Sequence, residues 1–359
     1  MISRRALLVQ AAALSLAGPT FARTERGLRA LAAAKGILFG TAAANYELRD
    51  ADFARLLPHE AALLVAEYEM KRKALEPLRE QYDFTDADAL VTYARGKGLL
   101  FRGHTLVWYA ANPDWLPQAV LSSRDEKLLT GYIEKVAGHF RGRMDSWDVV
   151  NEALLPQDGR ADGLRDNFWL KAFGPGYIDT AFHAARAADP HALLVYNDWG
   201  CEAGAAYNDR FRTVTLKMLD GMLARGTPVQ GLGMQGHLSA FGAQVDQRKL
   251  RDFLNEIEAR KLSILITELD VDDSGGPTDI GLRDQASADA ARRFLDVMLD
   301  NRAVRTVLTW GLSDRYLDPP DWRERLKGWR SRKLPYDTDL QKKPLWTAMA
   351  DAFAHARYR

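Results

Sequence analysis

The chain has 359 residues, of which 47% are hydrophobic and 27% charged, and its formal net charge is +1. This composition is typical of an ordinary soluble globular protein, and the balanced charge gives no electrostatic reason to expect binding to nucleic acid or to an anionic membrane. Cys201 is the single cysteine, which excludes an intrachain disulfide and a cysteine-based metal cluster.

The N-terminus predicts a targeting segment. The sequence ISRR at 2–5 precedes an apolar run over 6–17, and TFA at 20–22 offers a small-x-small cleavage site. Paired arginines followed by leucines resemble a twin-arginine signal, and a Sec signal with a basic n-region is the alternative. We therefore expect residues 1–22 to be a removed signal peptide and residues 23–359 to form an exported domain, periplasmic or secreted. No later segment approaches the ~20 apolar residues of a membrane span, so we expect no membrane anchor after this removal.

Strand-like apolar runs then alternate with helical patterns almost to the end of the chain. The expected strands are Ile37–Thr41, Leu63–Glu67, Leu99–Thr105, Met144–Val150, Leu193–Asn197, Gly231–Met234, Ser263–Leu269 and Val304–Trp310. The expected helices are Thr85–Lys97, Arg124–Phe140, Phe168–Ala188, Tyr207–Ala224, Gln247–Arg260, Ala286–Asn301 and Pro344–His355. Thr85 is expected to be an N-cap, and Ser123 with Glu126 is expected to form a capping box.

This alternation predicts an α/β protein with a single-domain (β/α)8 TIM barrel. Several strand runs are continuously apolar, as expected for a parallel sheet that is covered on both faces, and eight strand-then-helix units suit a barrel. A doubly wound open sheet is the competing architecture, but no Gly-x-Gly-x-x-Gly follows the first strand. The chain has no repeat and no Pro/Gly/Ser linker. The irregular stretch over 314–340 is therefore expected to be a loop at the barrel mouth.

Two of the strand runs end on a glutamate. MDSWDVVNEALLP at 144–156 is apolar up to Asn151-Glu152, and LSILITELDV at 262–271 is apolar up to Thr267-Glu268. The carboxyl ends of barrel strands meet at one rim, so we expect Glu152 and Glu268 to face each other across a cleft. Either glutamate by itself could be a helix cap or a surface ion-pair partner. Together they suit cleavage of a glycosidic bond, in which one carboxyl protonates the leaving oxygen while the other attacks the anomeric carbon or activates water.

Further polar and aromatic side chains are expected at the same rim. Even spacing along a strand places three pairs on common faces: Glu268 with Asp270, Gln235 with His237, and His104 with Trp108. Asn151 and Glu152 are adjacent, so a regular strand would separate them. If both serve the site, the chain must leave regular strand geometry there, for example through a bulge.

The chain resembles glycoside hydrolase family 10, the retaining endo-β-1,4-xylanases. The matching segments are FGTAAANYE at 39–47, EYEMK at 67–71, FTDADALVTYARGKG at 84–98, RGHTLVW at 102–108, WDVVNEAL at 147–154, VYND at 195–198, MQGHLS at 234–239, ITELDV at 266–271 and WGLSDRY at 310–316. The resemblance implies a polysaccharide or oligosaccharide substrate, no cofactor, no metal and a monomer.

The resemblance also implies roles for individual residues. Glu152 would be the general acid/base and Glu268 the nucleophile, with Asn151 bonding the sugar 2-hydroxyl. His237 would hydrogen-bond Glu268, with Asp270 orienting its imidazole. The remaining matches are substrate-binding positions at Lys71, His104, Trp108, Gln235 and Trp310, with Glu67 in support.

Three positions depart from the family pattern. Tyr68 stands where the family usually has Asn, Tyr109 where it tends to have His, and Leu317-Asp318-Pro319-Pro320 where an aromatic residue is common. The resemblance thus implies the same bond chemistry, with a decorated xylan or an exopolysaccharide as an alternative glycan.

Other classes of function are less well supported. A non-catalytic carbohydrate-binding protein remains an alternative, although both glutamates are present. HEAAL at 59–63 begins like a zinc motif but has Leu63 where the second histidine is required, and no Gly-x-Ser-x-Gly occurs. The basic cluster RERLKGWRSRK at 323–333 is expected to be a solvated loop, or to contact an acidic sugar substituent through Arg330 and Arg332.

Overall fold

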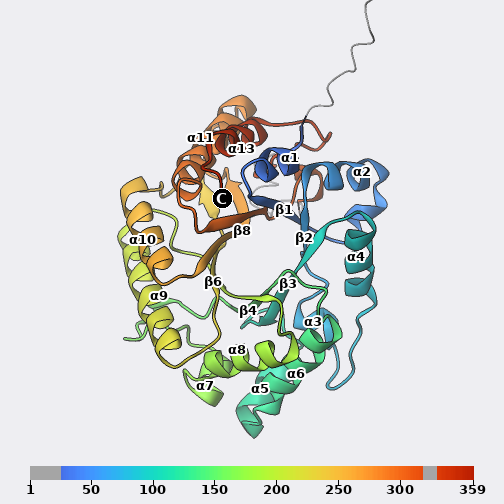
Figure 1. The fold of residues 1–359 in the computed structure, drawn as a ribbon, viewed down its shortest axis with the longest axis vertical. Coiled ribbons are helices and arrows are strands. Elements are labelled where there is room, and N and C mark those ends of the chain that lie inside the picture. Colours follow the sequence, from blue (N-terminus) through green and yellow to red (C-terminus); the bar gives the residue numbers. More distant parts are fainter. Residues whose placement is uncertain (1–25, 318–329) are drawn as a thin grey trace, which may run out of the picture.

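Eight parallel strands close into a barrel in the computed structural model, which describes residues 26–317 and 330–359 (Figure 1). They are β1 (Leu38–Ala43), β2 (Leu63–Ala66), β3 (Leu100–Val107), β4 (Ser146–Asn151), β5 (Leu193–Asp198), β6 (Gly231–Met234), β8 (Ser263–Asp272) and β9 (Val304–Thr309). Each pairs with the next, and the pairs β6–β8 and β9–β1 close the ring. The predicted (β/α)8 barrel is confirmed. Every expected strand run overlaps one of these strands, although several strands extend a few residues beyond the expected end.

A short ninth strand, β7 (His237–Ser239), was not expected. It pairs in parallel with the carboxyl end of β8, where His237 lies opposite Asp270. This pairing extends β8 beyond the barrel to Asp272 and brings two of the expected site residues together.

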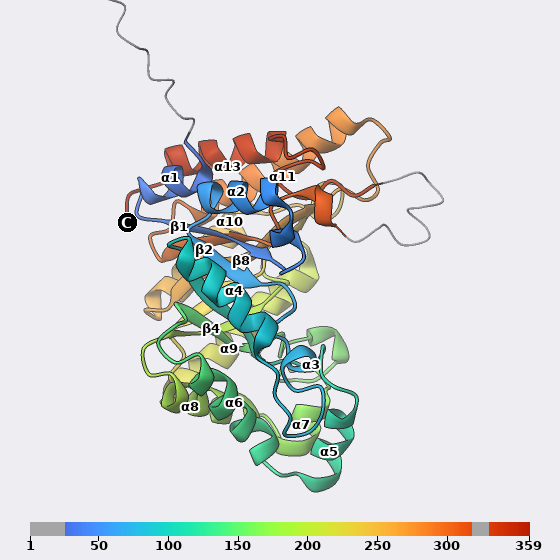
Figure 2. The same ribbon diagram turned by 90° about the vertical axis from the view of Figure 1, so that its right-hand side faces the viewer.

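Helices surround the barrel on all sides (Figures 1 and 2). They are α1 (Leu28–Ala33), α2 (Ala51–Glu60), α3 (Arg72–Leu75), α4 (Thr85–Gly96), α5 (Trp115–Ser123), α6 (Lys127–His139), α7 (Phe168–Phe173), α8 (Tyr177–Ala188), α9 (Ala206–Ala224), α10 (Gln247–Ala259), α11 (Ile280–Met298) and α13 (Pro344–His355). Three single turns of 3-10 helix are η1 (Glu47–Arg49), η2 (Pro156–Asp158) and η3 (Asp314–Tyr316). Helices α1, α2, α3 and α5 were not expected from the sequence.

Two expected helices begin differently. Ser123 is the last residue of α5, and Arg124 adopts a left-handed conformation with φ of 50°, so the expected capping box is wrong. The next helix, α6, begins only at Lys127, whose N–H donates to the Asp125 carboxylate at 3.0 Å. Thr85 is the first residue of α4 rather than its N-cap, because Asp83 accepts the Thr85 N–H at 2.9 Å.

The expected helix over 168–188 is two helices. Gly174-Pro175-Gly176 separates α7 from α8, and Gly174 has φ of 68°, which continues no helix. The expected helix from Ala286 begins earlier, at Ile280, because Asp279 caps it by accepting the Leu282 N–H at 2.9 Å.

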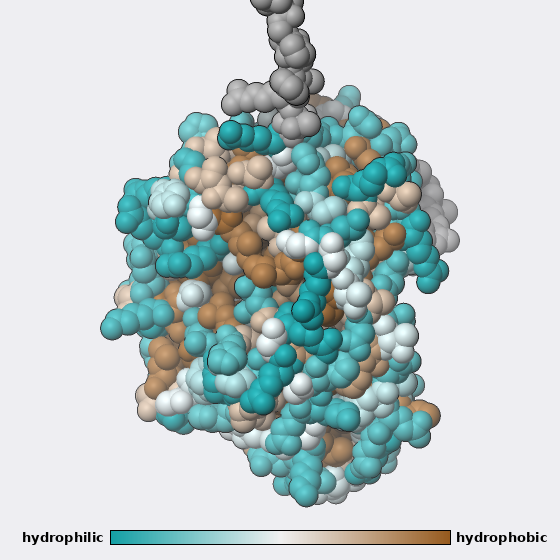
Figure 3. All heavy atoms as spheres, turned by 45° about the vertical axis from the view of Figure 1, so that its right-hand side comes forward, coloured by the Kyte–Doolittle hydropathy of each residue, from teal (hydrophilic) through white to brown (hydrophobic). Residues whose placement is uncertain are grey.

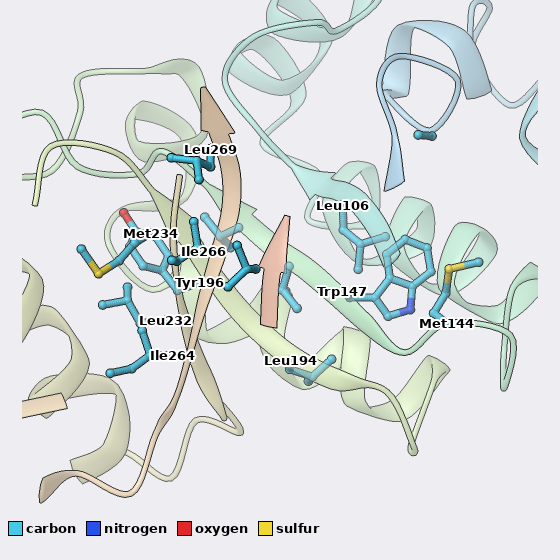
Figure 4. Close-up of a cluster of buried hydrophobic side chains, with 14 of the residues drawn as sticks. Leu106, Met144, Trp147, Leu194, Tyr196, Leu232, Met234, Ile264, Ile266 and Leu269 are labelled. Carbon is cyan, nitrogen blue, oxygen red and sulfur yellow. The ribbon is translucent and has the colours of Figure 1, made fainter. Parts of the chain in front are cut away.

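The outer faces of the strands carry large apolar side chains that pack against the helices (Figure 4). Trp147 on β4 is buried, and its indole N–H donates to Asp189 at 3.1 Å. Gly103 on the neighbouring β3 makes this possible, because a Cβ there would lie 2.1 Å from the Trp147 ring.

The two terminal helices meet at Glu60, near the amino end of β2. Glu60 ends α2, just before β2 begins, and accepts hydrogen bonds from Leu28 N at 2.8 Å and Trp346 Nε1 at 3.0 Å. It thereby ties α1 to α13, which lie side by side (Figure 2). The HEAAL segment is therefore structural and far from the strand ends that form the expected site.

Within the described ranges no helix is long and apolar enough to cross a membrane. The face drawn in Figure 3 is mostly hydrophilic, and its hydrophobic residues gather mainly in recessed areas.

We predict that Gly103→Ala destabilises the fold by about 1–3 kcal/mol, because the new methyl group overlaps the Trp147 ring. The matched control is Gly131→Ala within α6, where a Cβ meets nothing within 4 Å. That change should stabilise by roughly 0.5–1 kcal/mol. Denaturant unfolding monitored by circular dichroism measures both, and equal midpoints for the two variants would contradict this packing.

Candidate active site

Glu152 and Glu268 lie at the carboxyl ends of β4 and β8 and are joined through amide side chains. Asn151 Nδ2 donates to Glu152 Oε1 at 3.0 Å, and Asn197 Nδ2 donates both to Asn151 Oδ1 and to Glu268 Oε1, each at 2.8 Å. Gln235 Nε2 lies 3.2 Å from Glu152 Oε1. Both carboxyls are buried to nine-tenths or more of their residue surface. The structure therefore places the two glutamates in one hydrogen-bonded cluster.

The backbone leaves regular strand geometry at this point, as the sequence predicted. The β4–β5 register shifts between Asp148 and Val150, and Glu152 has φ of 54°. A positive φ is uncommon for a glutamate and is held here by a hydrogen bond from Glu152 N to Asn197 O at 2.9 Å. This change of direction lets Asn151 and Glu152 serve the same site although they are adjacent.

Asn197 at the end of β5 is a central residue that the sequence analysis did not single out. Its Oδ1 accepts a hydrogen bond from Thr267 Oγ1 at 2.6 Å, which fixes the amide so that Nδ2 faces Asn151 and Glu268. Gly233 leaves room for this, because a Cβ there would lie 2.3 Å from Asn197 Oδ1. The available signal was VYND at 195–198, an apolar run that ends on polar residues as the two glutamate strands do.

His237 lies between two carboxylates. Its Nε2 is 3.2 Å from Glu268 Oε2 and its Nδ1 is 2.8 Å from Asp270 Oδ1, so the expected contacts are present. Burial lowers the pKa of His237, but Asp270 and Glu268 outweigh it and raise the pKa well above its usual range. The ring therefore carries a proton on both nitrogens at neutral pH.

The charge on His237 acts in turn on Glu268. Burial would raise the pKa of Glu268, but the hydrogen bond from His237 and nearby positive charge hold it below its ordinary value. Asp270 behaves in the same way: burial opposes its charge, and the His237 cation lowers its pKa. Glu268 is thus kept ionised although it is buried.

The surroundings of Glu152 are different. Arg165 Nη2 lies 3.7 Å from Glu152 Oε2, and Arg165 Nε donates to the Glu152 carbonyl at 2.9 Å. The Arg165 guanidinium also stacks over the Tyr109 ring at 4.1 Å. Burial, followed by the Glu152 carboxylate, raises the pKa of the Tyr109 phenol. Tyr109, one of the three departures from the family pattern, therefore lies beside Glu152.

The aromatic residues of the site gather around Lys71. Lys71 Nζ is 5.3 Å from the Trp108 ring centre, 5.6 Å from that of Trp310 and 5.9 Å from that of Tyr68. Burial lowers the pKa of Lys71, although nearby carboxylates including Glu268 and Glu67 oppose the shift. This cluster provides flat apolar faces and one cation beside Glu268, an arrangement suited to holding a sugar.

His104 contributes to the same wall from β3. Its ring lies edge-on to Trp310 with centres 5.3 Å apart, and its Nδ1 is 3.0 Å from Asp148 Oδ2. Asp148 also pairs with the buried Arg102 inside the barrel. His104 is therefore held by Asp148 from inside the barrel. The position of His104 at the site was expected from the sequence, but its contact with Asp148 was not.

A cavity of about 400 Å³ opens beside Glu152 on the other side of the site. It is lined by loops after β5 and β6, and its lining includes Glu152, Trp199, Glu202, Tyr207, Gln235, His237 and Gln244.

All eleven expected site residues lie around the carboxyl ends of the strands. Among residues 26–317 and 330–359, no three His, Cys, Asp or Glu side chains form a group that could hold a metal ion.

Of the basic cluster at 323–333, the structure describes residues 330–333. Arg332 forms two hydrogen bonds with Asp284, at 2.9 and 2.7 Å, and Arg330 Nη2 lies 3.5 Å from Asp314 O. The Arg332 guanidinium is therefore engaged within the protein, which disfavours the expected contact with an acidic sugar. Residues 318–329, including the departure at 318–320, lie outside the described residues.

Comparison with known proteins identifies the family. The model of Glycosyl hydrolase family 10 matches residues 27–352. The chain belongs to glycosyl hydrolase family 10. The expectation of a glycoside hydrolase is thereby confirmed.

Similar family 10 proteins cover nearly the whole chain. Endo-1,4-beta-xylanase B of Thermotoga neapolitana is 32% identical over 338 residues, which are 92% of this chain and 93% of that protein. The crystal structure of xylanase 10B from Thermotoga maritima is 30% identical with a TM-score of 0.79, covering 91% of this chain and 98% of the other. That of xylanase 10B from Thermotoga petrophila in complex with xylobiose is 29% identical with a TM-score of 0.78, covering 91% and 97%.

We predict that the His237 ring stays protonated through the range in which an ordinary imidazole titrates, because the two carboxylates raise its pKa well above the usual value. In Asp270→Asn one carboxylate is lost, so the ring should release its proton at a lower pH than in the wild type. NMR of the imidazole signals in the full-length protein measures both. A wild-type ring that titrates at the ordinary imidazole pKa of about 6.5 would contradict the assignment.

Proposed function

We propose that the protein is a retaining endo-β-1,4-xylanase that hydrolyses xylan-type polysaccharide by double displacement. The observation that carries the proposal is the amide-linked pair Glu152 and Glu268, of which only Glu268 is hydrogen-bonded by a protonated imidazole. The pair therefore combines one carboxylate whose charged form is favoured with a second carboxyl that receives hydrogen bonds from neutral amides.

In the first step Glu268 attacks the anomeric carbon while Glu152 donates its proton to the leaving glycosidic oxygen. The bond between the anomeric carbon and that oxygen breaks, and a glycosyl ester forms on Glu268. The lowered pKa of Glu268 keeps the nucleophile ionised without an external base. His237 and Asn197 hold its two oxygens, which orients it toward the sugar.

In the second step Glu152 accepts a proton from water, and the water oxygen attacks the same carbon and releases Glu268. The ester carries no charge, so the Glu268 repulsion on Glu152 is absent while Glu152 acts as a base. Asn151 is hydrogen-bonded to Glu152 and Asn197, and we assign to its amide the bond to the sugar 2-hydroxyl. Gln235 lies beside Glu152 and supports that carboxyl in both steps.

The similar proteins support xylan as the substrate. The Thermotoga neapolitana relative is named as an endo-1,4-beta-xylanase, and the Thermotoga petrophila structure contains xylobiose. We further propose that the protein acts outside the cytoplasm after removal of residues 1–22, which rests on the N-terminal sequence, and as a monomer, which rests on the family resemblance.

We predict that Glu268→Ala lowers kcat on xylan by about 10⁴-fold or more, because no other group can form the glycosyl ester. Glu256→Ala is the matched control, since Glu256 is 59% exposed on α10 and pairs with Arg260. Reducing-sugar release from a panel of xylans and β-glucans is the measurement. Unchanged activity in Glu268→Ala would refute the nucleophile, and an inactive wild type on the whole panel would refute the function.

A second candidate function is hydrolysis of a different glycan, such as a decorated xylan or an exopolysaccharide. Tyr68 favours it, because this side chain is 48% exposed and its ring lies beside Lys71 at the sugar-binding wall. A phenol there occupies space and offers a stacking face where the family usually has a small amide.

We predict that Tyr68→Asn raises kcat/KM on linear xylo-oligosaccharides about 10-fold by clearing this space. Tyr358→Asn, at a residue that is 71% exposed near the C-terminus, should leave the value unchanged. Kinetics on a xylo-oligosaccharide length series measures the effect. The second candidate fails if the wild type already cleaves linear xylan as efficiently as a family member with Asn at this position.

A further inference from the structure

A lysine completes the row of charges that ends on Glu268. Lys333 Nζ lies 2.8 Å from Asp270 Oδ2, while the other oxygen of Asp270 lies 2.8 Å from His237 Nδ1. His237 Nε2 then lies 3.2 Å from Glu268 Oε2. Lys333, Asp270, His237 and Glu268 therefore alternate in sign, and their charges sum to zero when the imidazole is protonated.

The segment that carries Lys333 is held in place by other contacts. Asp273 Oδ1 accepts from Ser331 Oγ and Arg332 N, both at 3.2 Å, and Asp314 Oδ1 accepts from Leu334 N at 2.9 Å. The Lys333 carbonyl accepts from Val271 N on β8 at 3.2 Å.

Two ion pairs, Arg332 with Asp284 and Lys343 with Asp314, also hold this segment in place. The Arg332 guanidinium pairs with Asp284, and Lys343 Nζ donates to Arg332 O at 2.6 Å and to Asp314 Oδ2 at 2.7 Å. The backbone on both sides of Lys333 is thus fixed without its ammonium group. The ammonium is free to serve Asp270, and removing it should leave the segment folded.

We propose that Lys333 is a positioning residue for the nucleophile: through Asp270 and His237 it holds Glu268 in its ionised, oriented form. This inference rests on the proposed function, in which Glu268 attacks as a carboxylate. From the sequence, Lys333 was expected only to be part of the basic cluster at 323–333.

The charges around Glu268 and Asp270 explain how Lys333 acts on the nucleophile. Glu268 faces His237, His104 and Lys71, and Lys71 also lies near Glu152. Asp270 faces only His237 and Lys333 among the charges that act on it most, and Lys333 also lies near Asp272 and Glu67. Without the lysine, the three remaining residues carry a net charge of −1 when the imidazole is protonated, and one oxygen of Asp270 loses its partner. Both changes draw the His237 proton toward Asp270 and disfavour the ionised form of Glu268.

The sign of the pH effect follows. Glu268 must be ionised to attack, and its pKa is lowered, so on the acid side the wild type loses activity as the pH falls through that lowered pKa. Removing the Lys333 charge raises the pKa of Glu268. The acid limb of kcat/KM should therefore move to higher pH.

The test compares Lys333→Met, Lys333→Arg and Lys97→Met across pH on an aryl xylobioside, with thermal unfolding of each. Lys97 is exposed after α4, at the opposite end of the barrel, and controls for the loss of one positive charge. At a pH one unit below the wild-type limb, Lys333→Met should lose about 3- to 10-fold in kcat/KM. Above the limb it should stay within about twofold of the wild type, because there Glu268 is ionised in both proteins. Lys333→Arg should restore the wild-type profile, and Lys97→Met should leave it unchanged.

A uniform loss at every pH, or an unmoved limb in Lys333→Met, overturns the inference. If the wild type hydrolyses no glycan, the proposed function fails separately, and the His237 signals still test Lys333. The inference then predicts that Lys333→Met shifts the His237 ring ¹⁵N resonances in the full-length protein while Lys97→Met does not. Unchanged His237 resonances in Lys333→Met overturn it.

Discussion

The side-chain amide of Asn197 donates hydrogen bonds to Asn151 and to Glu268, and its oxygen accepts a hydrogen bond from the Thr267 hydroxyl. Three strands, β4, β5 and β8, are tied together at their carboxyl ends by this one group. An amide is suited to the position because it donates twice and accepts at the same time. The spacing of Glu152 and Glu268 depends on it, and Gly233 on β6 provides the space it occupies.

On this common frame the two carboxyls have opposite surroundings. Glu268 faces a histidine that is kept protonated by Asp270, so its charge is favoured despite burial. Glu152 receives neutral amides from Asn151 and Gln235 and borders the Tyr109–Arg165 stack. Two residues of the same type can then perform different steps because their partners differ. Tyr109 and Tyr68 change the rim of the site while this central arrangement is kept.

The barrel and the two glutamates could be predicted from local sequence patterns. Apolar runs of strand length indicate the barrel, and polar residues at the ends of those runs indicate the glutamates. The contacts of Arg165 and Lys333 could not be predicted, since each residue reaches the site from another element and no spacing along the chain indicates it. Some helix ends were also predicted wrongly, because a local contact or turn, and not the expected cap, sets where the helix begins or ends. The α6 helix begins at Lys127, whose N–H donates to Asp125, and Gly174-Pro175-Gly176 divides one apolar periodicity into α7 and α8. His237 was placed correctly, but the extra strand β7 that aligns it with Asp270 has only three residues, too few to show a periodicity.

The central claim is that Glu268 forms a bond to the sugar while Glu152 handles the proton, which requires the two carboxyls to lie close together on opposite sides of the anomeric carbon. The most direct measurement is ¹H NMR of the anomeric protons during the first turnovers on a β-1,4-linked xylo-oligosaccharide, before mutarotation. Two successive displacements return the configuration to that of the substrate, so the β-anomer should form first. Initial formation of the α-anomer would mean that water attacks directly, and it would contradict the account.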